Sequence, residues 1–148
     1  MRSTVTPDAA GSRTVLSIEG RVATGDLPGL REALSSVVAA MTPSVDLVVD
    51  VSAVTELDEL CAAVLRSAIV RARWNRNAVA VVAGAGPVAT VVRRAVHAPG
   101  VGLFPDVDAA VRALDDHRAT SAGRGASAVA GHGLPGHGIA NPFRSNLS

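Results

Sequence analysis

Hydrophobic residues recur along residues 14–114 in short alternating runs and in longer helical repeats, which predicts a series of strands and helices. The segment TVLSIEGRVA at 14–23 alternates apolar and polar residues, and Gly20 interrupts the alternation. This pattern predicts two short strands or a bulged hairpin. Residues 1–12 are polar and show no period, so we expect a flexible N-terminus.

Four segments place apolar residues three and four positions apart, as an amphipathic helix does when it packs one face on a core. Asp26 precedes the first segment and Asp106 the last, and both are expected N-cap residues. The predicted helices lie at residues 27–41, from 58 or 59 to about 74, at 87–96 and at 107–116.

Two runs, VDLVVDV at 45–51 and AVAVVAG at 78–84, are nearly all apolar, as strands covered on both faces are. A third, at 101–104, is short enough to be an edge strand. The resulting order is β-β-α-β-α-β-α-β-α. It predicts an α/β domain with a mixed β-sheet of four to five strands and about four helices, joined by right-handed crossovers in its parallel part.

The periodic pattern ends near His117, and residues 117–148 contain six glycines and two prolines. Such a segment buries too little apolar surface to offset the loss of chain entropy, so we expect a disordered Gly-rich tail. The folded domain is therefore expected to span residues 13–116.

The composition of the chain argues against several classes of function. Residues 1–116 carry 11 arginines against 13 acidic residues, which argues against nucleic-acid binding because that requires a basic face. No stretch approaches the roughly 18 apolar residues of a membrane helix. Cys61 is the one cysteine of the chain, as fits a reducing compartment, so we expect a cytoplasmic protein. We expect no metal site and no cofactor.

The stretch VTELDELCAAVL at 54–65 places Glu56, Asp58 and Glu59 where a strand meets a helix, next to Cys61. A thiol in the first turn of a helix has a lowered pKa and is a candidate redox sensor. Two neighbouring carboxylates have the opposite effect on the pKa, and a lone cysteine is more often a small core residue. We therefore favour a packing role for Cys61.

The loop Gly84-Ala85-Gly86-Pro87 follows a strand, opens a helix and belongs to a G-x-G-x-x-A pattern. Such a loop can present backbone N–H groups to a phosphate. Pro87 removes one of those donors, and too few residues follow to complete a dinucleotide fold. A tight turn explains both glycines, and Gly84 and Gly86 stay a candidate ligand loop.

The stretch from Asp50 to Thr55, followed by Leu57 and Asp58, resembles the signature of STAS domains. This family includes anti-sigma factor antagonists and the tails of sulfate transporters. Its pattern is an apolar strand ending in Asp-Leu-Ser, a loop with Val-Thr-x-x-Asp, and then Ser-Ser-Gly or a Thr variant where a helix begins. The resemblance covers about residues 12–116 and includes the order of strands and helices.

The resemblance implies a non-catalytic bacterial regulator of transcription. In the family, the first serine after the aspartate is phosphorylated by an anti-sigma factor that is also a kinase. The unphosphorylated domain binds this anti-sigma factor and frees the sigma factor. Here Glu59 stands at the phosphoacceptor position, Leu60 at the second serine and Cys61 at the glycine, while Ala23 replaces a frequent Asp. The expected partner-binding residues are Arg21, Ala23, Thr24, Thr55, Glu56, Asp58, Glu59 and Leu60.

Two interpretations of Glu59 stay open. A carboxylate in the first helical turn is stabilised by about 0.3–1 kcal/mol through the helix dipole, whatever its function. The carboxylate also resembles a permanent but weaker form of phosphoserine, because a phosphoserine carries more charge and three acceptor oxygens.

We expect an anti-sigma factor or related kinase-like regulator as partner and no phosphorylation cycle at the usual site. The sequence also allows a homo-oligomer. Two alternatives are a ligand-sensing STAS module for a nucleotide or lipid, and a small α/β enzyme using Cys61.

Overall fold

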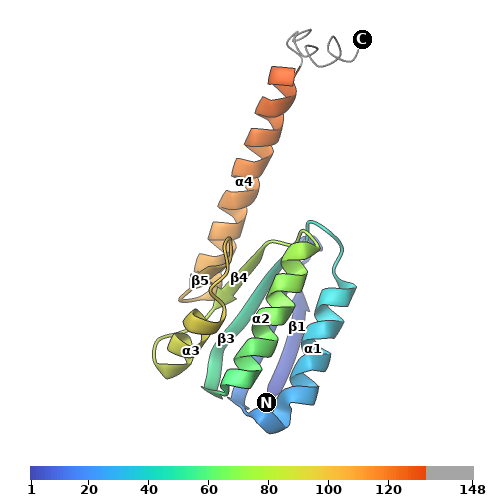
Figure 1. Cartoon of the computed structure of the whole chain (residues 1–148). Helices are drawn as coiled ribbons and strands as arrows, with labels where there is room; N and C mark the ends of the chain where they lie inside the picture. Colours follow the sequence, from blue (N-terminus) through green and yellow to red (C-terminus); the bar gives the residue numbers. More distant parts are fainter. Residues whose placement is uncertain (133–148) are drawn as a thin grey trace, which may run out of the picture. The chain divides into compact units, whose positions relative to one another are not determined.

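The computed structural model describes residues 1–132, and the chain divides into two units, Met1–Leu114 and Asp115–Ser148. Strands and helices alternate in the predicted order (Figure 1). The elements are β1 (Arg2–Pro7), β2 (Arg13–Val22), a 3-10 turn η1 (Thr24–Asp26), α1 (Leu27–Ala40), β3 (Asp46–Leu57), α2 (Glu59–Trp74), β4 (Val79–Val82), α3 (Pro87–Ala95), β5 (Gly102–Phe104) and α4 (Val107–His132).

The five strands form one sheet in the order β1-β2-β3-β4-β5. Strand β1 pairs antiparallel with β2, and the remaining neighbours are parallel. Helices α1, α2 and α3 lie on one face, where α1 and α2 run side by side (Figure 1). The predicted α/β architecture with a mixed sheet and four helices is therefore confirmed.

The alternation of side chains along the strands divides the core between the two faces of the sheet. In β3, Leu47, Val49 and Val51 pack with the helices α1–α3, whereas Val48 belongs to the cluster on the opposite face. That second cluster contains Ala110 and Leu114 from the first turns of α4. Both faces of β4 and of the first half of β3 are covered, which explains the apolar runs at 47–49 and 79–82, whereas the end of β3 beyond Val51 is partly exposed.

We predicted a flexible N-terminus, but residues 2–7 form the edge strand β1. All six of its residues are exposed, so β1 has no buried alternate positions that would reveal a strand. Its order comes from the backbone ladder with β2 and from a turn closed by Asp8, whose carboxylate accepts from the N–H groups of Ser12 at 2.8 Å and Arg13 at 3.2 Å. The expected pair of strands or bulged hairpin at 14–23 is a single strand that ends at Val22.

Strand β2 is irregular where the sequence predicted an interruption. Its register against β3 shifts between Ser17 and Glu19 and again between Gly20 and Arg21. Gly20 has φ +88°, a backbone conformation that favours glycine. Beyond it the parallel pairing continues, so β3 extends to Leu57 and the expected loop at 52–57 is strand.

The C-terminal segment also differs from the prediction of disorder. Helix α4 continues through residues 117–132, whereas residues 133–148 of the expected tail lie outside the described part. Residues 117–123 are exposed, so this stretch lacks the apolar period used to identify helices. Residues 117–132 contain five alanines, the residue with the highest intrinsic helix propensity, although three glycines in the same stretch oppose the helix.

Candidate partner-binding site

The carboxyl ends of β2 and β3 bring the two predicted segments of the site together. The paired positions Arg21 with Glu56, and Val22 with Leu57, place the turn after β2 beside the start of α2. Arg21 and Glu56 form an exposed ion pair with Nε and Oε2 2.8 Å apart. Residues 20–24 and 55–60, 35 positions apart in sequence, therefore form one surface, which we call the corner.

Asp58 connects the two halves of the corner. Its Oδ1 accepts a hydrogen bond from the Leu60 N–H at 3.0 Å and caps α2. Its Oδ2 accepts from the Thr24 hydroxyl at 2.6 Å, and its own N–H donates to the Val22 carbonyl at 3.0 Å. The Thr24 hydroxyl, and after it the Leu60 N–H, lower the pKa of the Asp58 carboxyl because both stabilise the charged form.

Stability should therefore depend on Asp58 in a pH-dependent way. Folding lowers its pKa below the usual value of 3.8, so the carboxylate stabilises the fold above that pH. This contribution disappears as pH falls through the lower folded-state pKa. In urea unfolding, Asp58→Asn should lower the midpoint at pH 7 and differ less from the wild type near pH 2.5. If Thr24→Val is introduced first, the effect of Asp58→Asn at pH 7 should shrink, and an unchanged effect would contradict the role of this bond.

Glu59 lies in the first turn of α2, and its carboxylate contacts α3. The Oε1 atom is 3.3 Å from Nη1 of Arg94, and both side chains are largely exposed. This pair lines a hollow of about 200 Å³ between α2 and α3, and Arg66 is also among the lining residues. The negative charge at position 59 therefore has a cationic neighbour, which the sequence did not reveal because Arg94 lies 35 positions away.

Leu60 and Cys61 are adjacent, and only one of them faces solvent. Leu60 is 57% exposed, an unusual value for a leucine on a helix, and it adds an apolar contact to the charged corner. Cys61 is fully buried, and its thiol donates to the Ala23 carbonyl at 3.3 Å. Burial, and then the charges of Asp58 and Asp26, raise the pKa of this thiol.

Cys61 should consequently react slowly in the native protein. A buried thiol with a raised pKa contains little thiolate, which is the nucleophilic form. We expect iodoacetamide at pH 7.5 to modify native Cys61 at least about tenfold more slowly than Cys61 in urea, as followed by mass spectrometry. Equal rates in the two conditions would show that the thiol is accessible and would favour the redox interpretation.

The turn after β2 contributes its backbone at Ala23, where STAS domains often have aspartate. The Ala23 N–H donates to Oδ2 of Asp26 at 2.9 Å, and its carbonyl accepts from the Cys61 thiol. Asp26 thus closes the 3-10 turn η1. It is also the N-cap residue of α1, as predicted, but its side chain makes no capping bond to that helix.

The family comparison decides the fold family. The family model described as "Mlab, STAS domain" matches residues 5–102 of this chain. The chain belongs to the STAS domain family. The resemblance noted in the sequence is thereby confirmed, and the STAS domain includes strand β1 from about Val5 onward.

Solved structures of similar STAS proteins agree. An anti-sigma factor antagonist from Mycobacterium paratuberculosis is 26% identical, with 77% of this chain and 93% of that one covered and a TM-score of 0.61. RsbS of Moorella thermoacetica, in a serine-to-glutamate form, is 17% identical, with coverage of 80% and 98% and a TM-score of 0.64. The antagonist SpoIIAA in its unphosphorylated form is 12% identical, with coverage of 79% and 98% and a TM-score of 0.55. The last two show the fold alone. No curated protein matches the sequence.

The candidate ligand loop of this STAS domain lies at the start of α3. Gly84 and Gly86 are exposed, and Gly86, with φ +104°, is the N-cap residue before Pro87. Asp106, the expected N-cap residue of the last helix, caps α4 by accepting from the Ala109 N–H at 2.8 Å. The left-handed backbone of Gly86 accounts for that glycine as a turn residue, and ligand binding at this loop stays a prediction.

The described residues also bear on metal binding and on membrane spans. Across residues 1–132, His, Cys, Asp and Glu side chains do not gather in groups of three that could hold a metal ion. Within the same range, every helix is too short or too polar to span a bilayer.

Proposed function

We propose that this STAS domain is a non-catalytic anti-sigma factor antagonist that acts in the cytoplasm. Its partner would be an anti-sigma factor or a related kinase-like regulator, which binds the corner. The observation that carries the proposal is Glu59, which lies in the first turn of α2, at the family's phosphoacceptor position, between the cap residue Asp58 and the exposed Leu60.

The chemistry of the corner supports binding rather than catalysis. An enzyme using Cys61 would need a base near the thiol, but the thiol donates to the Ala23 carbonyl, and its acidic neighbours oppose its ionisation. The exposed part of the corner combines Leu60 with charged groups on Glu56 and Glu59. An apolar side chain within a charged rim is typical of protein–protein interfaces.

Position 59 also supports regulation without a phosphorylation cycle. Glu59 has no hydroxyl to accept a phosphoryl group, and it carries a negative charge at a place where the N-terminal dipole of a helix favours one. We infer that the charge that other members gain by phosphorylation is permanent here. Its pairing with Arg94 holds the carboxylate at the surface between α2 and α3.

A direct test incubates the full chain with candidate anti-sigma kinases, with and without ATP. Binding is measured by calorimetry and any phosphate is mapped by mass spectrometry. We expect binding whose strength ATP does not change. A phosphate on Ser52 or Thr55 would contradict the absence of a cycle. Failure of every anti-sigma factor of the source organism to bind would contradict the function itself. Leu60→Asp, which replaces the exposed apolar side chain of the corner with a further negative charge, should abolish binding without unfolding the domain.

A further inference from the structure

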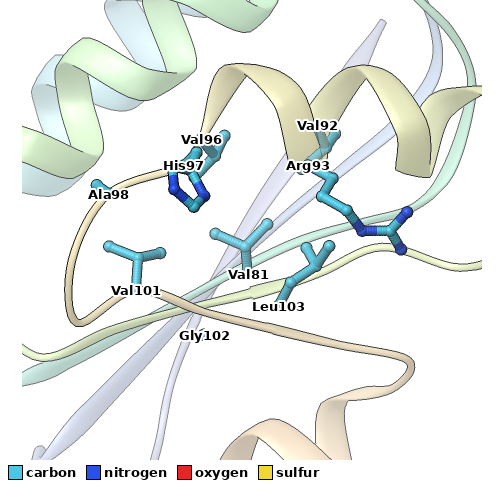
Figure 2. A pocket seen from close by; sticks show the side chains of 9 residues that line it. All are labelled: Val81, Val92, Arg93, Val96, His97, Ala98, Val101, Gly102 and Leu103. Carbon is cyan, nitrogen blue, oxygen red and sulfur yellow. The ribbon is translucent and has the colours of Figure 1, made fainter.

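A small cavity lies between α3 and the edge of the sheet, away from the corner and from the glycine loop. Its volume is about 160 Å³. Five apolar side chains form its walls, from β4, α3, β5 and the loop before β5 (Figure 2): Val81, Val92, Val96, Val101 and Leu103. The volume is close to that of an engineered apolar cavity of about 150 Å³ that binds benzene.

Two basic side chains stand at the cavity. Arg93 lies in the last turn of α3 and His97 just beyond its end, and in Figure 2 both lie on the side of the helix that faces Val81 and Leu103. In the part of the chain that the structure describes, Arg93 has no ion-pair partner, in contrast to Arg94 beside it. The guanidinium and an imidazole N–H are donors suited to a carboxylate.

The loop over the cavity is held in place from α2. Nη1 of Arg73 donates to the Gly100 carbonyl at 2.7 Å, and a turn closes where the Val101 N–H donates to the Ala98 carbonyl at 3.2 Å. Gly100, with φ +80°, allows this loop to arch away from α3. The loop therefore does not collapse into the space between the helix and Val101 (Figure 2).

We propose that this cavity binds a small organic carboxylate whose apolar body is about the size of a benzene ring. The body fills the space between Val81 and Val96, and the carboxylate receives hydrogen bonds from Arg93 and His97. The carbonyls at the end of α3 repel an anion, so the charge of Arg93 and the hydrogen bonds from both side chains must supply the attraction. The proposal concerns a site distinct from the corner and does not depend on the partner.

The cavity can be tested with benzoate as probe and with the backbone amide signals of the labelled full chain as the NMR readout. We expect about millimolar affinity and shifts confined to the residues around Val96 and Leu103. Benzylammonium has the same ring with the opposite charge and should cause no shifts there. Comparable shifts from both probes, or benzoate shifts scattered over the surface, would overturn the proposal.

Variants test the contribution of the Arg93 charge and that of the cavity volume separately. Arg93→Gln should weaken benzoate binding about two- to fivefold, because an exposed ion pair contributes little. Arg94→Gln is the matched control, since it removes the other arginine of the same last turn and should leave benzoate binding unchanged. Val101→Phe fills the cavity and should abolish binding. Equal losses in the two arginine variants would overturn the proposal even if Val101→Phe failed to fold.

Discussion

Leu65→Ala is expected to lower the free energy of unfolding by about 2–5 kcal/mol. Leu65 is 2% exposed and packs in the core between α2 and the sheet. Removing its side chain loses the transfer free energy of the buried methyl groups and leaves a cavity that close-packed neighbours fill only partly. Urea unfolding followed by circular dichroism measures the loss.

The same helix provides the control for this expectation. Leu60→Ala makes the same chemical change five residues earlier, where the side chain is 57% exposed, and should alter stability by no more than about 0.5 kcal/mol. For partner binding the order should reverse, with Leu60→Ala weakening the complex and Leu65→Ala affecting it only through the folded fraction. Similar unfolding losses in both variants would mean that α2 does not pack in this orientation.

The agreement between sequence and structure depends on how local each signal is. Helix α2 was predicted almost to the residue because its cap Asp58 and its apolar face, including Cys61 and Leu65, lie within a few turns of one another. Strand β4 and the first half of β3, up to Val51, were predicted because burial on both faces selects apolar runs, whereas the partly exposed end of β3 was not. In each predicted element, the residues that indicate it lie close together in the sequence.

Features set by contacts between distant segments were missed. Strand β1 is exposed throughout, so its ladder with β2 has no counterpart in hydrophobic pattern, although Asp8 and Gly11 stand where a turn favours these residues. Arg94 is similar, since nothing near it in sequence indicates that α3 places it against Glu59. The corner residues were identified through the family pattern. The position of Arg94 beside them is set by the packing of α2 on α3 and has no signal in the sequence.

That cation changes what is expected of position 59. A glutamate with no neighbouring cation would present its full charge to a partner, whereas the Arg94 guanidinium, with Nη1 3.3 Å from the carboxylate, offsets part of it. The pair is exposed, so it adds less than about 1 kcal/mol to stability. Its main effect would be on the electrostatic potential that an approaching anti-sigma factor meets.

Glu59→Ser should therefore strengthen binding of the anti-sigma factor about tenfold, which corresponds to about 1.4 kcal/mol, if the permanent charge opposes the complex. Arg94→Gln should act in the opposite direction, because it leaves the carboxylate without its compensating charge. Asp108→Ser is the control, since it also removes an acid from the first turn of a helix and shares any loss of dipole stabilisation, but lies on α4. Calorimetric titration of the four proteins distinguishes the two interpretations of Glu59. Opposite changes in affinity in the Glu59 and Arg94 variants would identify a switch fixed in one state. If all three variants bind with wild-type affinity, Glu59 is a helix-stabilising residue at a lost phosphorylation site.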